Sequence, residues 1–375
     1  MNEATVRCVM NKSLAHISGV VLIFGVFAFA TLCGNAAHAE MFSSTVYAVQ
    51  PLDDESERTT SIAFSPDAAL IAWATSDKEQ GQLFWGYDNY GLKWTKIADI
   101  NREGAQVSFS SDSSRLAVAS PLSKTKKGSA ATGTLEMFST ALSGNVPQHI
   151  VQVPTSLWKT ALPKYSVLQT VFSPDSTLLA GVCNDRAVRV WNVADGKTLK
   201  TFNIARDVKT LVFTANGELV VAAGAKTKGE LQWWNLTTSK MTRKVDVGAS
   251  FESLFVAEEG ATVLSSGSKG VVTFWNAANG AKIKTVTMEH SATSLQAVSP
   301  DGAWFAGFVA GENANDLVLS QWDEDGALRL SYSSNRGPQR PVAFAPNTEH
   351  IATGGVGGTA PNVDHAMLNV WPVNQ

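Results

Sequence analysis

Few side chains of this chain stand at the spacings that catalysis requires. Metal catalysis needs several His, Cys or carboxylate ligands that converge on one point. The four histidines beyond residue 40 are far apart, and no HxxxH spacing joins them: His149, His290, His350 and His365. The sequence also lacks the glycine-flanked serine of a nucleophile elbow and the glycine loop of a phosphate site. We therefore predict no catalytic, cofactor-binding or metal-binding residues, and no cofactor.

Charged and aromatic residues instead gather in segments of a kind that binds another protein. A basic tip lies within residues 120–133, two aromatic residues lie within 155–166, and acidic residues lie within 310–316 and 356–366. Aromatic side chains beside charges are favoured at protein interfaces. The alternative is that these segments are only tolerated, solvated insertions. The predicted partner-binding residues are Lys124, Lys126, Lys127, Trp158, Tyr165, Glu312, Asp316 and Asp364.

The elements that position these segments belong to an internal repeat. The phrase VFSPDSTLLAGVC, which begins at Val171, recurs in seven copies whose anchor residues are spaced by 45, 63, 41, 42, 43 and 46 positions. The anchors are Phe64, Phe109, Phe172, Phe213, Phe255, Val298 and Phe344. Each copy leads into a short alternating run that closes on an aromatic residue: Trp85, Phe138, Trp191, Trp234, Trp275, Trp322 and Trp371. A repeat of about 40 to 45 residues with a Trp at a constant place is typical of a propeller blade.

Each copy predicts four strands. The anchor run predicts an inner strand, and Ser-Pro-Asp predicts a tight turn. LLAGVC then predicts a strand buried on both faces, AVRVW a more exposed one, and TLKTF the outer strand. We therefore predict an all-β fold, a seven-bladed β-propeller of four-stranded antiparallel blades. Because the chain finishes on a third strand, we expect residues 45–50 to complete the last blade and close the ring.

The pattern resembles the WD-repeat (WD40) family of β-propellers over the chain from Ser44 to Gln375. The Trp-Asp pair of that family survives only at Trp322-Asp323, and other copies carry Asn in place of Asp, as at Asn192. The buried Asp–His–Ser–Trp network of that family is therefore incomplete here, and we expect Asn to serve the turn by local hydrogen bonds. The tryptophans predicted to pack between blades are Trp85, Trp191, Trp234, Trp275, Trp322 and Trp371.

Loop lengths indicate which face of the disc binds. The connections between second and third strands, and those from one blade to the next, lie on the same face. They are longest in blades six, seven, one and two, which are consecutive in a closed ring. We place residues 155–166 on this face as an insertion that links blade two to blade three. Because insertions gathered on one face often mark the binding face of a repeat protein, we predict a non-catalytic scaffold for protein–protein interaction.

An enzyme is the alternative function. A hydrolase or lactonase site built from carboxylates scattered over inner strands would leave little trace in the linear sequence. Three or more carboxylates or histidines converging on the mouth of the central channel would favour this small-molecule enzyme. A flat face with apolar loop residues would favour the scaffold.

Residues 1–39 have the pattern of a signal peptide. Arg7 and Lys12 precede an apolar run from Ile17 to Cys33, and Ala37-His38-Ala39 is a small-x-small cleavage site. We predict cleavage near Ala39, a bacterial protein that is periplasmic or secreted, and a single propeller domain over residues 40–375. An uncleaved membrane anchor is the alternative. The apolar run of about 17 residues is marginal for crossing a bilayer, which favours the cleaved signal peptide.

Cysteine content and charge narrow the expected partners. Cleavage would leave Cys183 as the single cysteine, so we expect no internal disulfide and a buried thiol at this position. The formal net charge of −3 supplies no basic field for nucleic acid. We expect a monomer that meets the membrane only through its export signal and binds an unidentified protein of the cell envelope.

Overall fold

A computed structural model describes fifteen segments of the chain. They are residues 47–51, 58–76, 81–87, 93–100, 103–123, 132–141, 154–225, 228–247, 251–267, 270–287, 294–309, 316–322, 328–333, 341–354 and 366–373. The predicted signal peptide lies outside the described residues.

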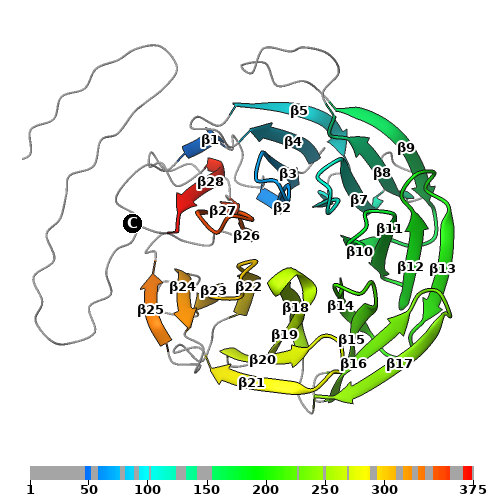
Figure 1. Ribbon diagram of the computed structural model, residues 1–375. Coiled ribbons are helices and arrows are strands. Elements are labelled where there is room, and N and C mark those ends of the chain that lie inside the picture. The colour runs from blue at the N-terminus through cyan, green and yellow to red at the C-terminus, as the bar shows by residue number, and fades with distance from the viewer. Residues whose placement is uncertain are drawn as a thin grey trace, which may run out of the picture.

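The described strands form seven four-stranded antiparallel sheets, arranged as blades around a central axis (Figure 1). Blade one holds β2–β5 (Arg58–Phe64, Leu70–Ser76, Gly81–Tyr87, Lys93–Ile100), and blade two holds β6–β9 (Gln106–Phe109, Arg115–Ser123, Thr132–Ser139, Thr155–Leu162). Blade three holds β10–β13 (Val167–Phe172, Leu178–Cys183, Ala187–Asn192, Thr198–Asn203), and blade four holds β14–β17 (Val208–Phe213, Leu219–Ala225, Lys228–Asn235, Lys240–Asp246). In each, the first strand is innermost and the fourth is outermost (Figure 1).

The remaining blades follow the same order. Blade five holds β18–β21 (Phe251–Ala257, Thr262–Gly267, Val271–Asn276, Lys282–Thr287), with the short 3-10 helix η1 (Glu258–Gly260) between its first two strands. Blade six holds β22–β25 (Ser294–Val298, Trp304–Val309, Asp316–Trp322, Leu328–Ser333). Blade seven holds β26–β28 (Val342–Phe344, His350–Gly354, Ala366–Pro372) and takes β1 (Tyr47–Pro51) as its outer strand.

Strand β1 joins the two ends of the described chain in one sheet. Tyr47 pairs with Val370 and Val49 pairs with Leu368 in an antiparallel ladder. The described strand covers residues 47–51 and ends one residue beyond the predicted end at residue 50. Because β1 pairs with the edge of β28, the last blade has the same four strands as the others.

The prediction that residues 155–166 form an inserted loop was wrong. Residues 155–162 are strand β9, the outer strand of blade two, in which Trp158 pairs with Met137. An outer strand is solvated on much of its surface, so its residues carry little of the apolar pattern that identifies a strand. The longest connection of the second repeat instead joins β8, which ends at Ser139, to β9, which begins at Thr155.

Hydrogen bonds within the turn explain why Ser-Pro-Asp follows the inner strand. In blade three, Asp175 accepts hydrogen bonds from the Ser173 hydroxyl at 2.6 Å and from the Thr177 amide at 3.1 Å. These bonds favour the charged carboxylate and lower the pKa of Asp175, the Ser173 bond most of all. The residue after the matching Asp or Asn acceptor has a positive φ in six blades: Ala68, Ser113, Ser176, Gly217, Gly302 and Thr348. In blade five the helix η1 takes the place of this turn, and Gly260 has a positive φ.

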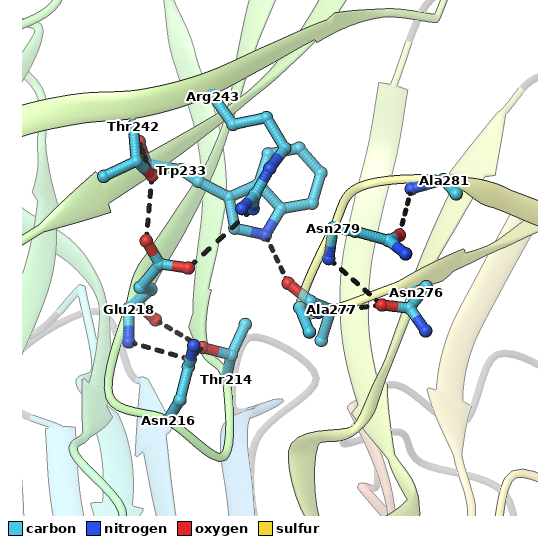
Figure 2. A network of polar contacts seen from close by, with 11 residues as sticks. Thr214, Asn216, Glu218, Trp233, Thr242, Arg243, Asn276, Ala277, Asn279 and Ala281 are labelled. Atoms are coloured by element: carbon cyan, nitrogen blue, oxygen red, sulfur yellow. Dashed lines mark hydrogen bonds and ion pairs between the residues drawn. The ribbon is translucent and has the colours of Figure 1, made fainter.

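The asparagine after the closing Trp also serves its turn through local hydrogen bonds. Asn192 accepts from the Ala194 amide at 2.8 Å, and Asn276 accepts from the amides of Ala278 and Asn279 at 3.0 Å each (Figure 2). The amide oxygen of Asn replaces a carboxylate here without bringing a charge into the turn. This agrees with the role that the sequence predicts for Asn at these positions.

The tryptophans that close the third strands are packed between blades where their side chains are described. Trp191 is 1% exposed in a cluster that combines residues of blades two and three, and Trp275 is 5% exposed between blades four and five. Trp234 is partly buried between blades three and four. The side chains of Trp322 and Trp371 lie outside the described part of the structure.

Trp85 is fully buried but points to the other side of its sheet. Trp191 pairs with Leu179, whereas in blade one the matching Ile71 pairs with Gly86, and Trp85 pairs with Ala72. A shift of one residue turns a strand side chain to the opposite face. Trp85 therefore packs forward onto blade two, and Trp191 packs backward onto the same blade.

Candidate functional site

The disc has two unlike faces. We call the end that carries the connections between second and third strands, and the links between blades, the loop face. The start of β10 lies at this end because Val167 pairs with Cys183, beside the hairpin at residues 184–186. We call the opposite end, which carries the Ser-Pro-Asp turns, the turn face.

On the turn face, hydrogen bonds connect each of several blades to the next one in the ring. The Asp67 amide donates to the Ser113 hydroxyl at 3.0 Å, and the Asp112 amide donates to the Ser176 hydroxyl at 3.0 Å. Further around the ring, the Ala215 amide donates to the Gly260 carbonyl at 3.1 Å. Polar groups on this face are thus used within the fold.

Six of the eight predicted partner-binding side chains lie outside the described part of the structure. Lys124, Lys126, Lys127, Glu312 and Asp364 lie outside the described residues. Asp316 begins strand β24, where its backbone pairs with Val309, and its side chain is not described. The predicted cluster therefore stays a prediction for these six positions.

Trp158 is not the loop residue that the sequence predicts. Its Nε1–H donates to the Val193 carbonyl of blade three at 2.8 Å. Its ring covers Gly196 so closely that a Cβ added there would lie 2.7 Å from the indole. Val193 and Gly196 follow Asn192 in the turn from β12 to β13, on the turn face. Trp158 therefore joins two blades at the face opposite to the predicted one.

Tyr165 does lie in the link between blades two and three, but its ring is covered. The Arg189 guanidinium lies 3.7 Å from the centre of the Tyr165 ring and binds the Asp185 carboxylate through two bonds of 2.8 and 2.6 Å. Burial raises the pKa of the Tyr165 phenol, while the nearby Arg189 charge opposes the rise. This arrangement is a cation–π contact that stabilises the junction.

Cys183 lies beneath this junction as a buried, free thiol. Burial raises the pKa of the Cys183 thiol to about 11, which outweighs the opposing effect of Arg189. The thiol is therefore protonated at neutral pH and is a poor nucleophile.

Backbone bulges place three exposed side chains at the loop-face ends of innermost strands. Each innermost strand of blades three, four and five has an irregularity beside its second residue, and these residues are Leu168, Lys209 and Glu252. Leu168 is 49% exposed, and Lys209 and Glu252 are also exposed. A bulge inserts one residue and redirects its side chain away from the sheet faces. No sequence pattern marks such an extra residue, which is why the sequence did not predict this site.

Charged residues form ion pairs on the loop face of blades three and four. Arg186 and Asp207, both well exposed, form an ion pair of 3.1 Å between the two blades. The nearly buried carboxylate of Glu230 is held by Lys244 at 2.6 Å and Arg206 at 3.3 Å. Burial would raise the pKa of Glu230, but the hydrogen bonds from Lys244 and Gln232 and the charges of both cations outweigh it, so the pKa is lowered.

A cleft of about 220 Å³ opens between blades one and two. Its walls combine apolar residues with the Glu136 carboxylate, which binds the Lys159 ammonium at 2.7 Å and the Ser156 hydroxyl at 2.7 Å. Pockets for small-molecule ligands are typically about 300–1,000 Å³, so this cleft has room for a single side chain of a partner. Its lining residues are Leu83, Ala98, Asp99, Ile100, Val118, Ser120, Thr134, Glu136, Phe138 and Lys159.

The described segments contain no cluster of metal ligands and no membrane-spanning helix. No group of three or more His, Cys, Asp or Glu within them could hold a metal ion. Within them, too, no helix combines the length and the apolar character needed to cross a bilayer.

Comparison with known families identifies the class of fold. Residues 161–192 match the model of the WD domain, G-beta repeat (WD40). This segment covers the link to blade three and the first three strands of that blade, including the Ser-Pro-Asp turn and Trp191. Together with the ring of four-stranded blades, the match supports a WD-repeat β-propeller.

Curated relatives are similar to the chain over part of their length. The B-type cell cycle switch protein ccs52B of Medicago truncatula is 24% identical over 72% of this chain and 57% of its own length. Human apoptotic protease-activating factor 1 is 26% identical over 28% of this chain and 9% of its own length. Subunit I of eukaryotic translation initiation factor 3 from Neurospora crassa is 29% identical over 28% of each protein. The chain thus spans less than two thirds of each of these relatives.

Solved structures share the fold over most of the chain. A chain in the crystal structure of the mitotic checkpoint complex superposes with a TM-score of 0.63 at 16% identity, covering 93% of this chain and 100% of that one. The β-propeller domain of Cps50 (Swd1) from Myceliophteria thermophila has a TM-score of 0.62 at 13% identity, over 84% of this chain and 97% of that one. At these identities the likeness shows the fold alone.

Proposed function

We propose that this chain is a non-catalytic interaction scaffold whose loop face binds a protein partner. The observation that carries the proposal is the set of exposed bulge residues at the loop-face ends of the innermost strands: Leu168, Lys209 and Glu252. They present one aliphatic and two charged side chains on a rigid inner rim, a mixture that protein interfaces use. The described turns of the opposite face bond to one another instead.

The test is site-specific crosslinking from each face of the full-length protein in the cells that produce it. A photoreactive amino acid replaces Lys209 or Glu252 on the loop face, and Lys240 or Lys282 on the turn face as matched exposed controls. We expect a defined protein adduct, identified by mass spectrometry, from the loop-face positions only. Adducts that form only from the turn face, or equally from both faces, contradict the proposal.

We further propose that the protein is exported in a bacterial cell and meets its partner in the envelope. The support is the charged, apolar and small-residue order of residues 1–39. N-terminal sequencing of the protein recovered from the periplasm or medium should begin near residue 40. An intact N-terminus in the membrane fraction would show an uncleaved anchor, and intact protein in the cytoplasm would contradict export.

A further inference from the structure

Basic residues outnumber acidic ones on the loop face of blades three and four. Among the described residues there, seven basic side chains stand against four acidic ones, a local formal charge of +3 in a chain whose formal net charge is −3. We call this surface the basic sector. Its basic members are Lys164, Arg186, Arg189, Arg206, Lys209, Lys228 and Lys244, and its acidic members are Asp185, Asp207, Glu230 and Asp246.

Ion pairs inside the basic sector involve all of its basic side chains except three lysines. Arg189 binds Asp185, Arg186 binds Asp207, and Glu230 is shared by Arg206 and Lys244. Three exposed lysines remain: Lys164, Lys209 and Lys228. Their side chains form no hydrogen bond or ion pair within the part of the chain that the structure describes. The excess positive charge is therefore available to a partner.

An apolar side chain lies at the inner border of the basic sector. Leu168 is 49% exposed at the bulge of β10, and Lys209 occupies the matching bulge of β14, the neighbouring innermost strand (Figure 1). An exposed aliphatic group beside a free ammonium suits a ligand that carries both an apolar side chain and carboxylates. Tyr165, an aromatic residue on this surface, is covered by Arg189 and offers no platform for stacking a nucleic-acid base.

We propose that the basic sector binds an acidic peptide segment of the protein partner. Carboxylates of the segment lie against Lys164, Lys209 and Lys228, and an aliphatic side chain lies against Leu168. The proposal rests on the proposed function, because it names the chemistry of the partner that the loop face binds. Charge complementarity of this kind directs the encounter and selects among partners more than it adds affinity.

The test measures binding of a labelled peptide to the full chain by fluorescence anisotropy. The probe is a twelve-residue peptide of Glu and Asp around a central pair of Leu, compared with the same peptide carrying Lys in place of the acids. The test variant is Lys209→Glu with Lys228→Glu. The matched control is Lys240→Glu with Lys282→Glu, which makes the same charge change at exposed first residues of the outer strands β17 and β21.

We expect the Lys209→Glu, Lys228→Glu variant to bind the acidic peptide on the order of tenfold more weakly, because two exposed attractions become repulsions. The control variant should stay within about twofold of the natural protein, and the peptide should dissociate as salt is raised. Equal weakening in both variants, no binding of the acidic peptide to the natural protein, or tighter binding of the lysine peptide or of a single-stranded oligonucleotide overturns the proposal. Thermal unfolding of each variant checks that it is folded.

The crosslinking experiment separates this inference from the proposed function. If the loop-face adduct forms equally with natural protein and with Lys228→Glu, Lys164→Glu, the partner binds that face without an acidic segment. The proposed scaffold function is then retained, and the proposal that the partner binds through an acidic segment is wrong. If no adduct forms from the loop face in either protein, the proposed function itself fails.

Discussion

Single residues join the blades at the turn face. Trp158 donates to the Val193 carbonyl at 2.8 Å, and Trp233 donates to the Ala277 carbonyl at 2.9 Å (Figure 2). In both cases the acceptor is the second residue after the closing Trp of the next blade. Each indole thus satisfies a turn carbonyl while its ring adds apolar contact, which is the usual pattern for a buried Trp.

The close contact at Gly196 predicts a measurable loss of stability. Gly196→Ala should lower the free energy of unfolding by about 2 kcal/mol or more, because φ is +69° and the new Cβ would meet the Trp158 ring at 2.7 Å. Gly217→Ala is the control: its φ is +76°, but nothing lies within 4 Å of the new Cβ, so about 1 kcal/mol is expected. Denaturant unfolding measures both losses, and equal losses would show that the Trp158 ring does not restrict position 196.

Acid should weaken the turn in blade two through Asp112. Partial burial raises the pKa of Asp112, but hydrogen bonds from Ser110, Ser114 and Ser176 outweigh it and lower the pKa to about 2. Because the folded-state pKa lies below the unfolded value of about 4, this carboxylate stabilises the fold above pH 4 and loses that effect as the pH falls to 2. Asp112→Asn keeps the shape, as Asn216 does in blade four, and removes the charge.

Thermal unfolding of the natural protein and of Asp112→Asn checks this prediction. The natural protein should have the higher midpoint at pH 7, and the difference between the two should shrink as the pH is lowered from 4 to 2. A difference that stays constant over this range would show that the carboxylate charge does not contribute.

At the scale of elements, the sequence predicted strands well where both faces are buried and poorly where they are exposed. Apolar runs such as LLAGVC marked the second strands because both of their faces are covered by neighbouring blades. Strand β9 was missed because most of its residues are exposed or half-buried. The bulges at Leu168 and Lys209 were missed because an extra residue in one strand has no local signal.

The closing strand β1 gives a prediction at this scale. A protein that starts at residue 52 lacks the partner of β28 and exposes the backbone edge of that strand. We expect a lower thermal midpoint and association that is visible by light scattering, because an unpaired edge favours pairing between copies. A protein that starts at residue 47 keeps β1 and is the control. Equal behaviour of the two proteins would show that β1 does not stabilise the ring.

At the scale of the whole molecule, the sequence by itself determined the repeated four-stranded unit, its Ser-Pro-Asp turn and the packing role of Trp191. These features recur from one repeat to the next, and they follow an apolar period that is visible along the chain. Only the tertiary structure decided that Trp158 clasps Gly196 and that Arg189 covers Tyr165, removing both aromatic rings from the predicted binding loops. It also decided that Lys209 and Leu168 occupy matching bulges of neighbouring innermost strands, because residues of different repeats meet only once the blades are placed around the axis.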